Sequence, residues 1–122
     1  MGATESKVSH SDNDFELVIR CSKELEHILE KHFQATGKGL HEKITSASGL
    51  PAELIRDMRY LATLRNKLVH EHGFNAIPDR STFILRFERS EQNLNSILQE
   101  RQRRLQAATQ RRNTNDGACI IS

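Results

Sequence analysis

The sequence predicts an all-α fold, a small bundle of three long helices and one short helix over residues 12–107. Apolar side chains recur at spacings of three and four residues in three separate segments, which is typical of amphipathic helices. No segment alternates apolar and polar residues well enough to indicate a strand. The length of 122 residues fits one domain. Because only 5% of the residues are aromatic, Leu, Ile and Val must supply most of the core.

The first long helix is predicted to begin in the polar run 12–14 and to end near Gly37. Asp and Asn are favoured N-caps because their side chains accept hydrogen bonds from the free amides of the first turn. A short second helix is predicted from Leu40 to Ala47, between the breaks at Gly39 and Gly49. The apolar positions of the first helix are Phe15, Val18, Cys21, Leu25, Ile28, Leu29 and Phe33.

The third helix is predicted to start at Pro51, at the first helical position, where the missing N–H of proline has no partner to lose. Residues 73–78 are rich in turn formers and separate this helix from the last one. Asp79 is the expected cap of that last helix. Its apolar positions are Phe83, Ile84, Phe87, Leu94, Ile97, Leu98 and Leu105.

The two ends of the chain are predicted to lie outside the bundle, with a disordered segment over residues 1–11 and a flexible basic and polar tail over residues 108–122. Charge is distributed unevenly between the predicted helices. Residues 1–79 carry ten Lys and Arg against twelve Asp and Glu, whereas residues 80–112 carry eight Arg against three Glu. The last helix is therefore the basic part of the molecule, which suits a polyanionic partner or a solvated helix face.

Several classes of protein are excluded by the sequence. No apolar run approaches the roughly 18 residues that span a bilayer, so an integral membrane protein is not expected. Residues 1–11 contain no apolar stretch of the kind that a secretory signal requires. Cys21 and Cys119 are the only cysteines, which argues against a disulfide framework and favours a reducing compartment. We therefore expect a cytoplasmic protein.

The third helix places an arginine on its apolar face. The apolar positions of this helix are Leu54, Ile55, Met58, Leu61, Ala62, Leu68 and Val69. On a helical wheel that starts at Leu54, Arg65 falls at about 20°, near the middle of the apolar arc. A guanidinium keeps its proton, and burying it without a partner is costly. Two ordinary explanations are an ion pair with a carboxylate of another helix and a long side chain that extends to water.

The residues around Arg65 favour a third explanation. Residues 61–73 read LATLRNKLVHEHG, in which Arg65, Asn66 and His70 resemble the Arg-x4-His signature of the HEPN domain superfamily. That resemblance covers about residues 14–100. It implies a small helical bundle in which the motif lies near the end of a late helix, followed by a turn and a last helix.

The resemblance implies a metal-independent endoribonuclease, or an RNA-binding protein, of a toxin–antitoxin, phage-defence or mobile-element system, with no cofactor. Attack of a 2′-hydroxyl on the adjacent phosphate needs a group that moves a proton near pH 7 and a fixed positive charge. His70 suits the first role and Arg65 the second. Asn66 is four residues from His70, on the same helix face, where its amide can orient the imidazole. The predicted catalytic residues are therefore Arg65, Asn66 and His70.

An ideal helix separates Arg65 and His70 by about 140°. Their convergence requires either a loosened helix near Gly73 or a symmetric dimer, and the resemblance implies a homodimer. The alternative is a non-catalytic helical interaction module, in which His70 and His72 are polar residues that favour a helix C-terminus. One toxin branch of the family carries a Tyr at the position of His72 that a partner nucleotidyltransferase modifies, so that form of neutralisation is not expected here. An antitoxin or another protein partner remains open.

Basic residues in two segments are candidates for contacts with RNA phosphates. The same residues also suit a solvated helix surface. No metal site is predicted, because the His and Cys residues lack zinc-ligand spacing. The candidate RNA-binding residues are Lys67, His72, Arg101, Arg103 and Arg104.

Both ends of the chain match lipidation patterns. Residues 119–122 read CIIS, the form of a farnesylation signal on Cys119, and the N-terminus fits a myristoylation pattern on Gly2. A prenyl chain next to basic residues is a sufficient two-signal anchor for a peripheral membrane protein. Both signals require eukaryotic transferases, so the other interpretation is a chance tail on a bacterial protein.

Overall fold

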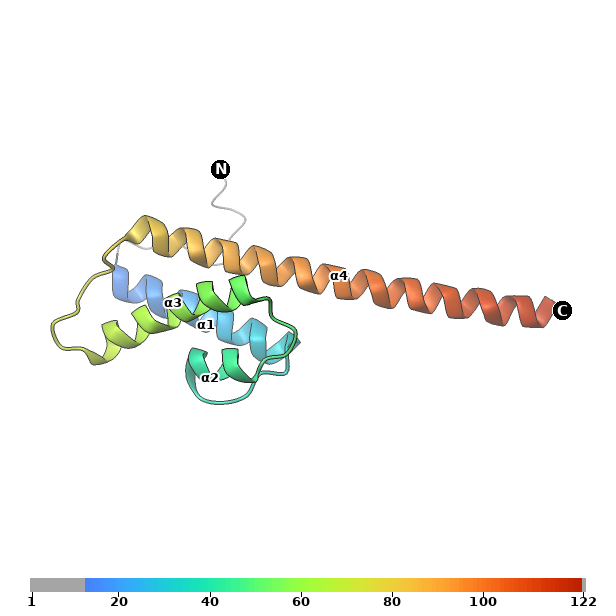
Figure 1. The fold of residues 1–122 in the computed structure, drawn as a ribbon, viewed down its shortest axis with the longest axis horizontal. Coiled ribbons are helices and arrows are strands. Elements are labelled where there is room, and N and C mark those ends of the chain that lie inside the picture. The colour runs from blue at the N-terminus through green and yellow to red at the C-terminus, as the bar shows by residue number, and fades with distance from the viewer. Residues whose placement is uncertain (1–12, 122) are drawn as a thin grey trace. The chain divides into compact units, whose positions relative to one another are not determined.

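The structure is a computed structural model that describes residues 13–121, with side chains described for residues 13–111. It consists of four helices, α1 (Asp14–His32), α2 (Gly39–Ser46), α3 (Ala52–His70) and α4 (Arg80–Ile121) (Figure 1). No strand occurs within the described residues. The predicted all-α fold with three long helices and one short helix is therefore confirmed.

The chain divides into two compact units, Met1–Gln92 and Asn93–Ser122, and the boundary lies within α4. The predicted helical domain over residues 12–107 spans this boundary. The backbone stays helical through Ile121, past the predicted domain end at residue 107. The predicted disordered segment 1–11 lies outside the described residues.

The helix starts follow local hydrogen bonding. Asn13 caps α1, since its Oδ1 accepts from the Glu16 amide at 2.9 Å. Asp79 caps α4 as predicted, because its carboxylate accepts from the amide of Thr82 at 3.1 Å. The position predicted for Pro51 was wrong by one residue. Pro51 is the N-cap of α3 with an extended ψ of 154°, and its carbonyl accepts the first helical hydrogen bond.

The core of the first unit lies between its helices, where α1 packs against α2 and α3, and α2 packs against α3. The first turns of α4 are joined to α1 and α3 by ion pairs of Arg80 with Asp14 and of Arg89 with Asp57. Three phenylalanines are completely buried, so aromatic residues fill more of the core than their number suggests. The largest fully buried side chains of this unit are Phe33, Phe83, Phe87, Leu17, Leu25, Leu29, Leu54, Met58 and Leu61.

The buried face of α3 is rotated relative to the predicted one. Leu64 and Asp57 are buried, whereas Ile55 is half-buried and Val69 is 37% exposed. Asp57 turns inward because Arg89 of α4 provides its counter-charge. No helix within the described residues combines the length and the apolar character that crossing a membrane requires.

Candidate functional site

The Arg-x4-His motif lies in the last two turns of α3. The helix stays regular up to His70, and Glu71 ends it by donating its amide to the carbonyl of Lys67 at 2.9 Å. The turn that follows is closed by a hydrogen bond from the Phe74 amide to the Glu71 carbonyl at 3.1 Å. One of the two ways to bring Arg65 and His70 together was a helix that loosens near Gly73. The helix is regular throughout the motif, so this way is not used.

Arg65 is half-buried, and its Nη1 donates to Oδ1 of the neighbouring Asn66 at 3.2 Å. Within the described residues no carboxylate lies at ion-pair distance from this guanidinium. Of the two ordinary explanations for Arg65, the ion pair with another helix is thus absent from this part of the chain. The Arg65 side chain is partly open to solvent, and Val69, one helical turn further on, is exposed as well.

His70 is exposed at the C-terminal end of α3. Among the side chains that the structure describes, it has no hydrogen bond with Asn66, whose amide oxygen instead accepts from Arg65. Arg65 and Asn66 are thus brought together, but His70 is not, because a regular helix keeps it about 140° from Arg65. One chain alone does not assemble the predicted catalytic group.

Lys67 and His72 lie near the same end of α3, and both are exposed. The Lys67 ammonium stands 5.6 Å from the centre of the Phe74 ring, within the range of a cation–π interaction. Phe74 also lines an open hollow of about 520 Å³, together with Leu68 and the start of α1. Phe15 lines the same hollow and is 50% exposed.

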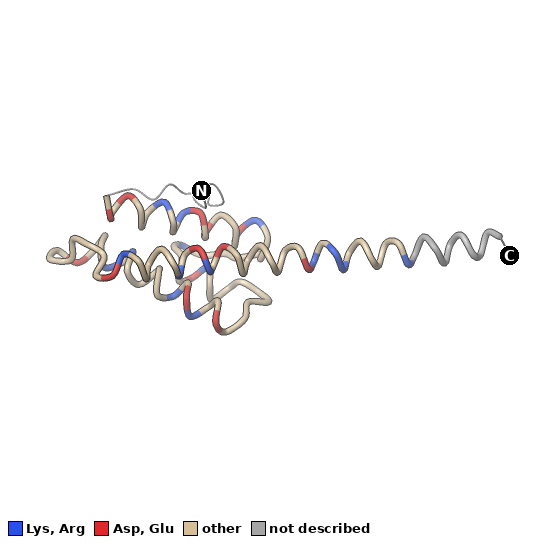
Figure 2. The backbone as a smooth tube through the Cα atoms, turned by 90° about the horizontal axis from the view of Figure 1, so that it is seen from above, with Lys and Arg blue, Asp and Glu red and all other residues tan. Residues whose placement is uncertain are grey.

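The basic residues Arg101, Arg103 and Arg104 lie in the second unit, on the part of α4 that follows Glu100. Figure 2 shows the Lys and Arg positions along the backbone in blue and the Asp and Glu positions in red. Arg103 and Arg104 both form ion pairs with Glu100, the latter at 3.1 Å. Their side chains are 75% and 79% exposed. Exposed pairs of this kind are weak, so Glu100 reduces the positive charge of this segment without preventing these arginines from contacting a polyanion.

A polar cluster at the junction of α2 and α3 was not predicted from the sequence. Arg59 of α3 donates to His41 Nδ1 at 3.0 Å and to Thr45 Oγ1 at 2.8 Å, both on α2. The Oγ1 of Thr63 lies 3.4 Å from His41 Nε2. The sequence did contain a pattern that indicates such a cluster. Each helix carries two of these polar residues at a spacing of four, which places each pair on one helix face.

The cysteines, Gly2 and possible metal ligands are the remaining residues considered from the sequence. Cys21 is buried, as predicted, and burial, followed by the charges of Glu91 and two other glutamates, raises the pKa of its thiol, which keeps it unreactive. The described part of the chain contains no cluster of His, Cys, Asp and Glu that suits a metal ion. Gly2 and the side chain of Cys119 lie outside the described residues.

Comparison with known proteins gives no match. No family model, no curated protein and no solved structure is similar to this chain. The function is therefore argued from the residues of the chain themselves.

Proposed function

We propose that this chain is a HEPN-like, metal-independent endoribonuclease that acts as a homodimer. The observation that supports the proposal is the state of Arg65, a half-buried guanidinium whose hydrogen bond goes to an uncharged amide. A cation in this position retains the charge that a phosphate requires. Five residues further on, the exposed His70 provides an imidazole that can accept a proton.

The proposed reaction is attack of a ribose 2′-oxygen on the adjacent phosphorus. One His70 accepts the proton of the 2′-hydroxyl, and Arg65 stabilises the negative charge of the pentavalent transition state. The departing 5′-oxygen takes its proton from water, and the hydroxide that this leaves is neutralised by the His70 imidazolium, so that each site needs one His70 and one Arg65. The products are a 2′,3′-cyclic phosphate and a free 5′-hydroxyl. Asn66 holds the Arg65 guanidinium in place through the bond to its Oδ1.

The geometry of α3 supports a dimer. Because α3 is regular through His70, Arg65 and His70 of one chain point in different directions. A two-fold axis near the end of α3 places the Arg65 of one copy beside the His70 of the other. In this arrangement Arg65 and Val69 face the second copy, which accounts for their incomplete burial within one chain.

Cleavage of RNA in the presence of a chelator tests the proposal. Replacing His70 by Ala removes the proton-transfer group and is expected to slow cleavage by about 10²- to 10⁴-fold. His27→Ala is the matched control, since His27 is an exposed histidine of α1, and it is expected to cleave like the wild type. Wild-type protein that leaves RNA intact at high concentration, or a His70→Ala variant that cleaves equally well, contradicts the proposal.

A second candidate function is a non-catalytic helical interaction module. It is favoured by the open hollow at the ends of α1 and α3, where Phe15 is 50% exposed, since exposed aromatic side chains are common at protein interfaces. This function predicts intact RNA in the same assay. It also predicts that Phe15→Ser weakens self-association in analytical ultracentrifugation, whereas His70→Ala leaves it unchanged.

A further inference from the structure

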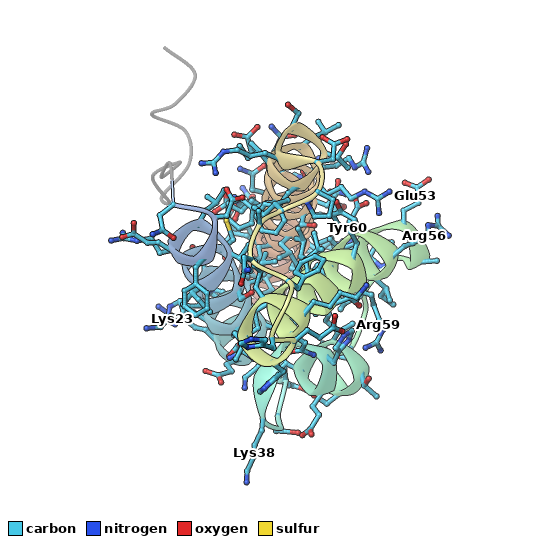
Figure 3. All side chains as sticks on the ribbon, turned by 90° about the vertical axis from the view of Figure 1, so that its left-hand side faces the viewer. Lys23, Lys38, Glu53, Arg56, Arg59 and Tyr60 are labelled. Carbon is cyan, nitrogen blue, oxygen red and sulfur yellow. The ribbon has the colours of Figure 1, made fainter. Side chains whose placement is uncertain are left out.

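Arg59 is a second half-buried guanidinium that has no carboxylate partner among the described side chains. Its Nη1 donates to Nδ1 of His41 at 3.0 Å and to the His41 carbonyl at 3.2 Å, and its Nη2 donates to Thr45 Oγ1 at 2.8 Å. All three acceptors are uncharged. Figure 3 shows Arg59 beside α2, on the opposite side of this unit from Lys23.

Other half-buried arginines of the first unit have a carboxylate within ion-pair distance. Arg80 pairs with Asp14, and Arg86 lies 3.9 Å from Asp57, whose charge it shares with Arg89. Arg59 has no such partner in the described part of the chain, and its Nε–H makes no hydrogen bond there. A partly desolvated positive charge with free donors is a good site for an anion.

The protonation of His41 adds to the anion-binding character of the cluster. Because Nδ1 accepts a hydrogen bond from Arg59, His41 is the neutral tautomer with its proton on Nε2, directed at Thr63 Oγ1. Burial, and then the charge of Arg59, lowers the pKa of His41. With its oxygen accepting from His41, the Thr63 hydroxyl is free to donate its own proton to a ligand. The Arg59 fork and the Thr63 hydroxyl together suit an oxyanion with several oxygens.

The cluster lies on the same face of α3 as two residues of the motif. On the helical wheel that starts at Leu54, Asn66, Arg59 and His70 fall at about 120°, 140° and 160°. Arg59 and His70 are eleven residues apart, which is about 16 Å along the helix. One phosphate cannot contact both residues, but a single RNA strand that lies along α3 can contact both through different phosphates.

We propose that Arg59 and Thr63 bind a backbone phosphate of the RNA strand, distinct from the phosphate that is cleaved. This inference rests on the proposed function, because it assigns a substrate subsite to the same α3 surface. It makes Arg59 a binding residue, not a catalytic one. Loss of Arg59 should therefore weaken RNA binding without removing the cleavage chemistry.

The test uses a short single-stranded RNA whose 2′-hydroxyls are methylated, so that it binds without being cleaved. Its affinity for the full chain is measured between 50 and 200 mM salt, with NMR of the His41 imidazole as a second readout. Arg59→Gln is expected to weaken binding several-fold and to reduce the slope of log affinity against log salt by about 0.7, the value for one lost phosphate contact. Lys23→Gln is the control, since it also removes one positive charge, here an exposed one that lies away from the cluster, and it should keep the wild-type slope.

Two further measurements keep the test decisive if Arg59→Gln does not fold. Arg59→Lys retains the charge and should keep the slope while binding more weakly, because the planar fork is lost. In the wild type, the methylated RNA should shift the His41 imidazole resonances. Unchanged resonances, or shifts produced by inorganic phosphate but not by RNA, overturn the inference. Cleavage by the wild type together with unaltered binding by Arg59→Gln refutes this subsite alone, whereas Arg59-dependent binding without cleavage refutes the nuclease proposal alone.

Discussion

The half-buried arginines of the first unit fall into two groups. Arg80 and Arg86 face the carboxylates of Asp14 and Asp57, and their charges support the fold. Arg59 and Arg65, both on α3, meet only uncharged side-chain acceptors in the described residues. The two groups differ in the free energy that a guanidinium gains by binding an anion. A cation that is already paired with a carboxylate gains less from a phosphate than an unpaired one. This contrast is the basis of both proposals.

His41 provides a prediction for the pH dependence of stability. Its pKa in the folded protein is lowered by burial and by Arg59, so between that pKa and the ordinary value of about 6.5 the unfolded chain binds more protons. The stabilisation by neutral His41 is complete above pH 6.5 and is lost as the pH falls through the folded pKa. His41→Asn keeps an acceptor for Arg59 without titrating. Its free energy of unfolding in urea should therefore fall less than that of the wild type between pH 7.5 and pH 5.

The exposed His27 of α1 provides the control for this measurement. His27→Asn should follow the wild-type pH dependence, because His27 lies on α1 and, among the side chains that the structure describes, makes no hydrogen bond with Arg59. Parallel pH profiles for the wild type and His41→Asn would show that His41 is not held neutral by the cluster.

At the scale of the helices, the apolar periodicity predicted which segments are helical and which side of α1 is buried, but it predicted the buried side of α3 only in part. The segments of α1, α2 and α3 agree with their predicted ranges to within a few residues at each end. The buried face of α3 differed, with Leu64 inside and Val69 partly outside, because the face is chosen by the helices packed against it. Asp57 is buried on account of Arg89, 32 residues away, and a pattern within one helix does not contain that information.

The candidate site was predictable to a similar extent. Arg65, Asn66 and His70 could be selected because they are close in sequence and form a recognisable motif. The bond between Arg65 and Asn66 was not expected, since the predicted partner of the amide was His70. The His41–Arg59 contact joins residues 18 positions apart on different helices, so it depends on how α2 packs against α3.

The contact between α3 and α4 has a measurable energetic consequence. Arg89 donates two hydrogen bonds of 2.8 Å to the carboxylate of the buried Asp57. Asp57→Asn removes the charge and one acceptor of this pair, and it should lower the free energy of unfolding by about 1.5–3 kcal/mol. Chemical denaturation is the measurement.

A matched control for this pair is Glu16→Gln. Glu16 forms an ion pair with Arg20 in which both side chains are about half exposed, and such pairs contribute about 0.5 kcal/mol or less. Equal losses for Asp57→Asn and Glu16→Gln would mean that burial of Asp57 adds nothing to the stability of the contact.

At the scale of the whole molecule, the two units differ in net charge. Residues 1–92 carry 13 Lys and Arg against 14 Asp and Glu, whereas residues 93–122 carry five Arg against two acidic residues. The net positive charge of the chain therefore belongs to the second unit. Each unit contributes differently to the proposed RNA binding, the first with specific phosphate contacts on α3 and the second with a basic segment that acts by charge alone.

The central claim is that two copies build one catalytic site from the Arg65 of one chain and the His70 of the other. Complementation measures this directly, with Arg65→Ala and His70→Ala each assayed alone and then as a re-equilibrated equimolar mixture in chelator. Each variant alone should be inactive. Half of the randomly re-formed dimers contain both variants and hold one intact site, so the mixture should recover about a quarter of the wild-type cleavage rate. A mixture that stays inactive beside an active wild type, although mass spectrometry shows that mixed dimers have formed, would contradict the shared site.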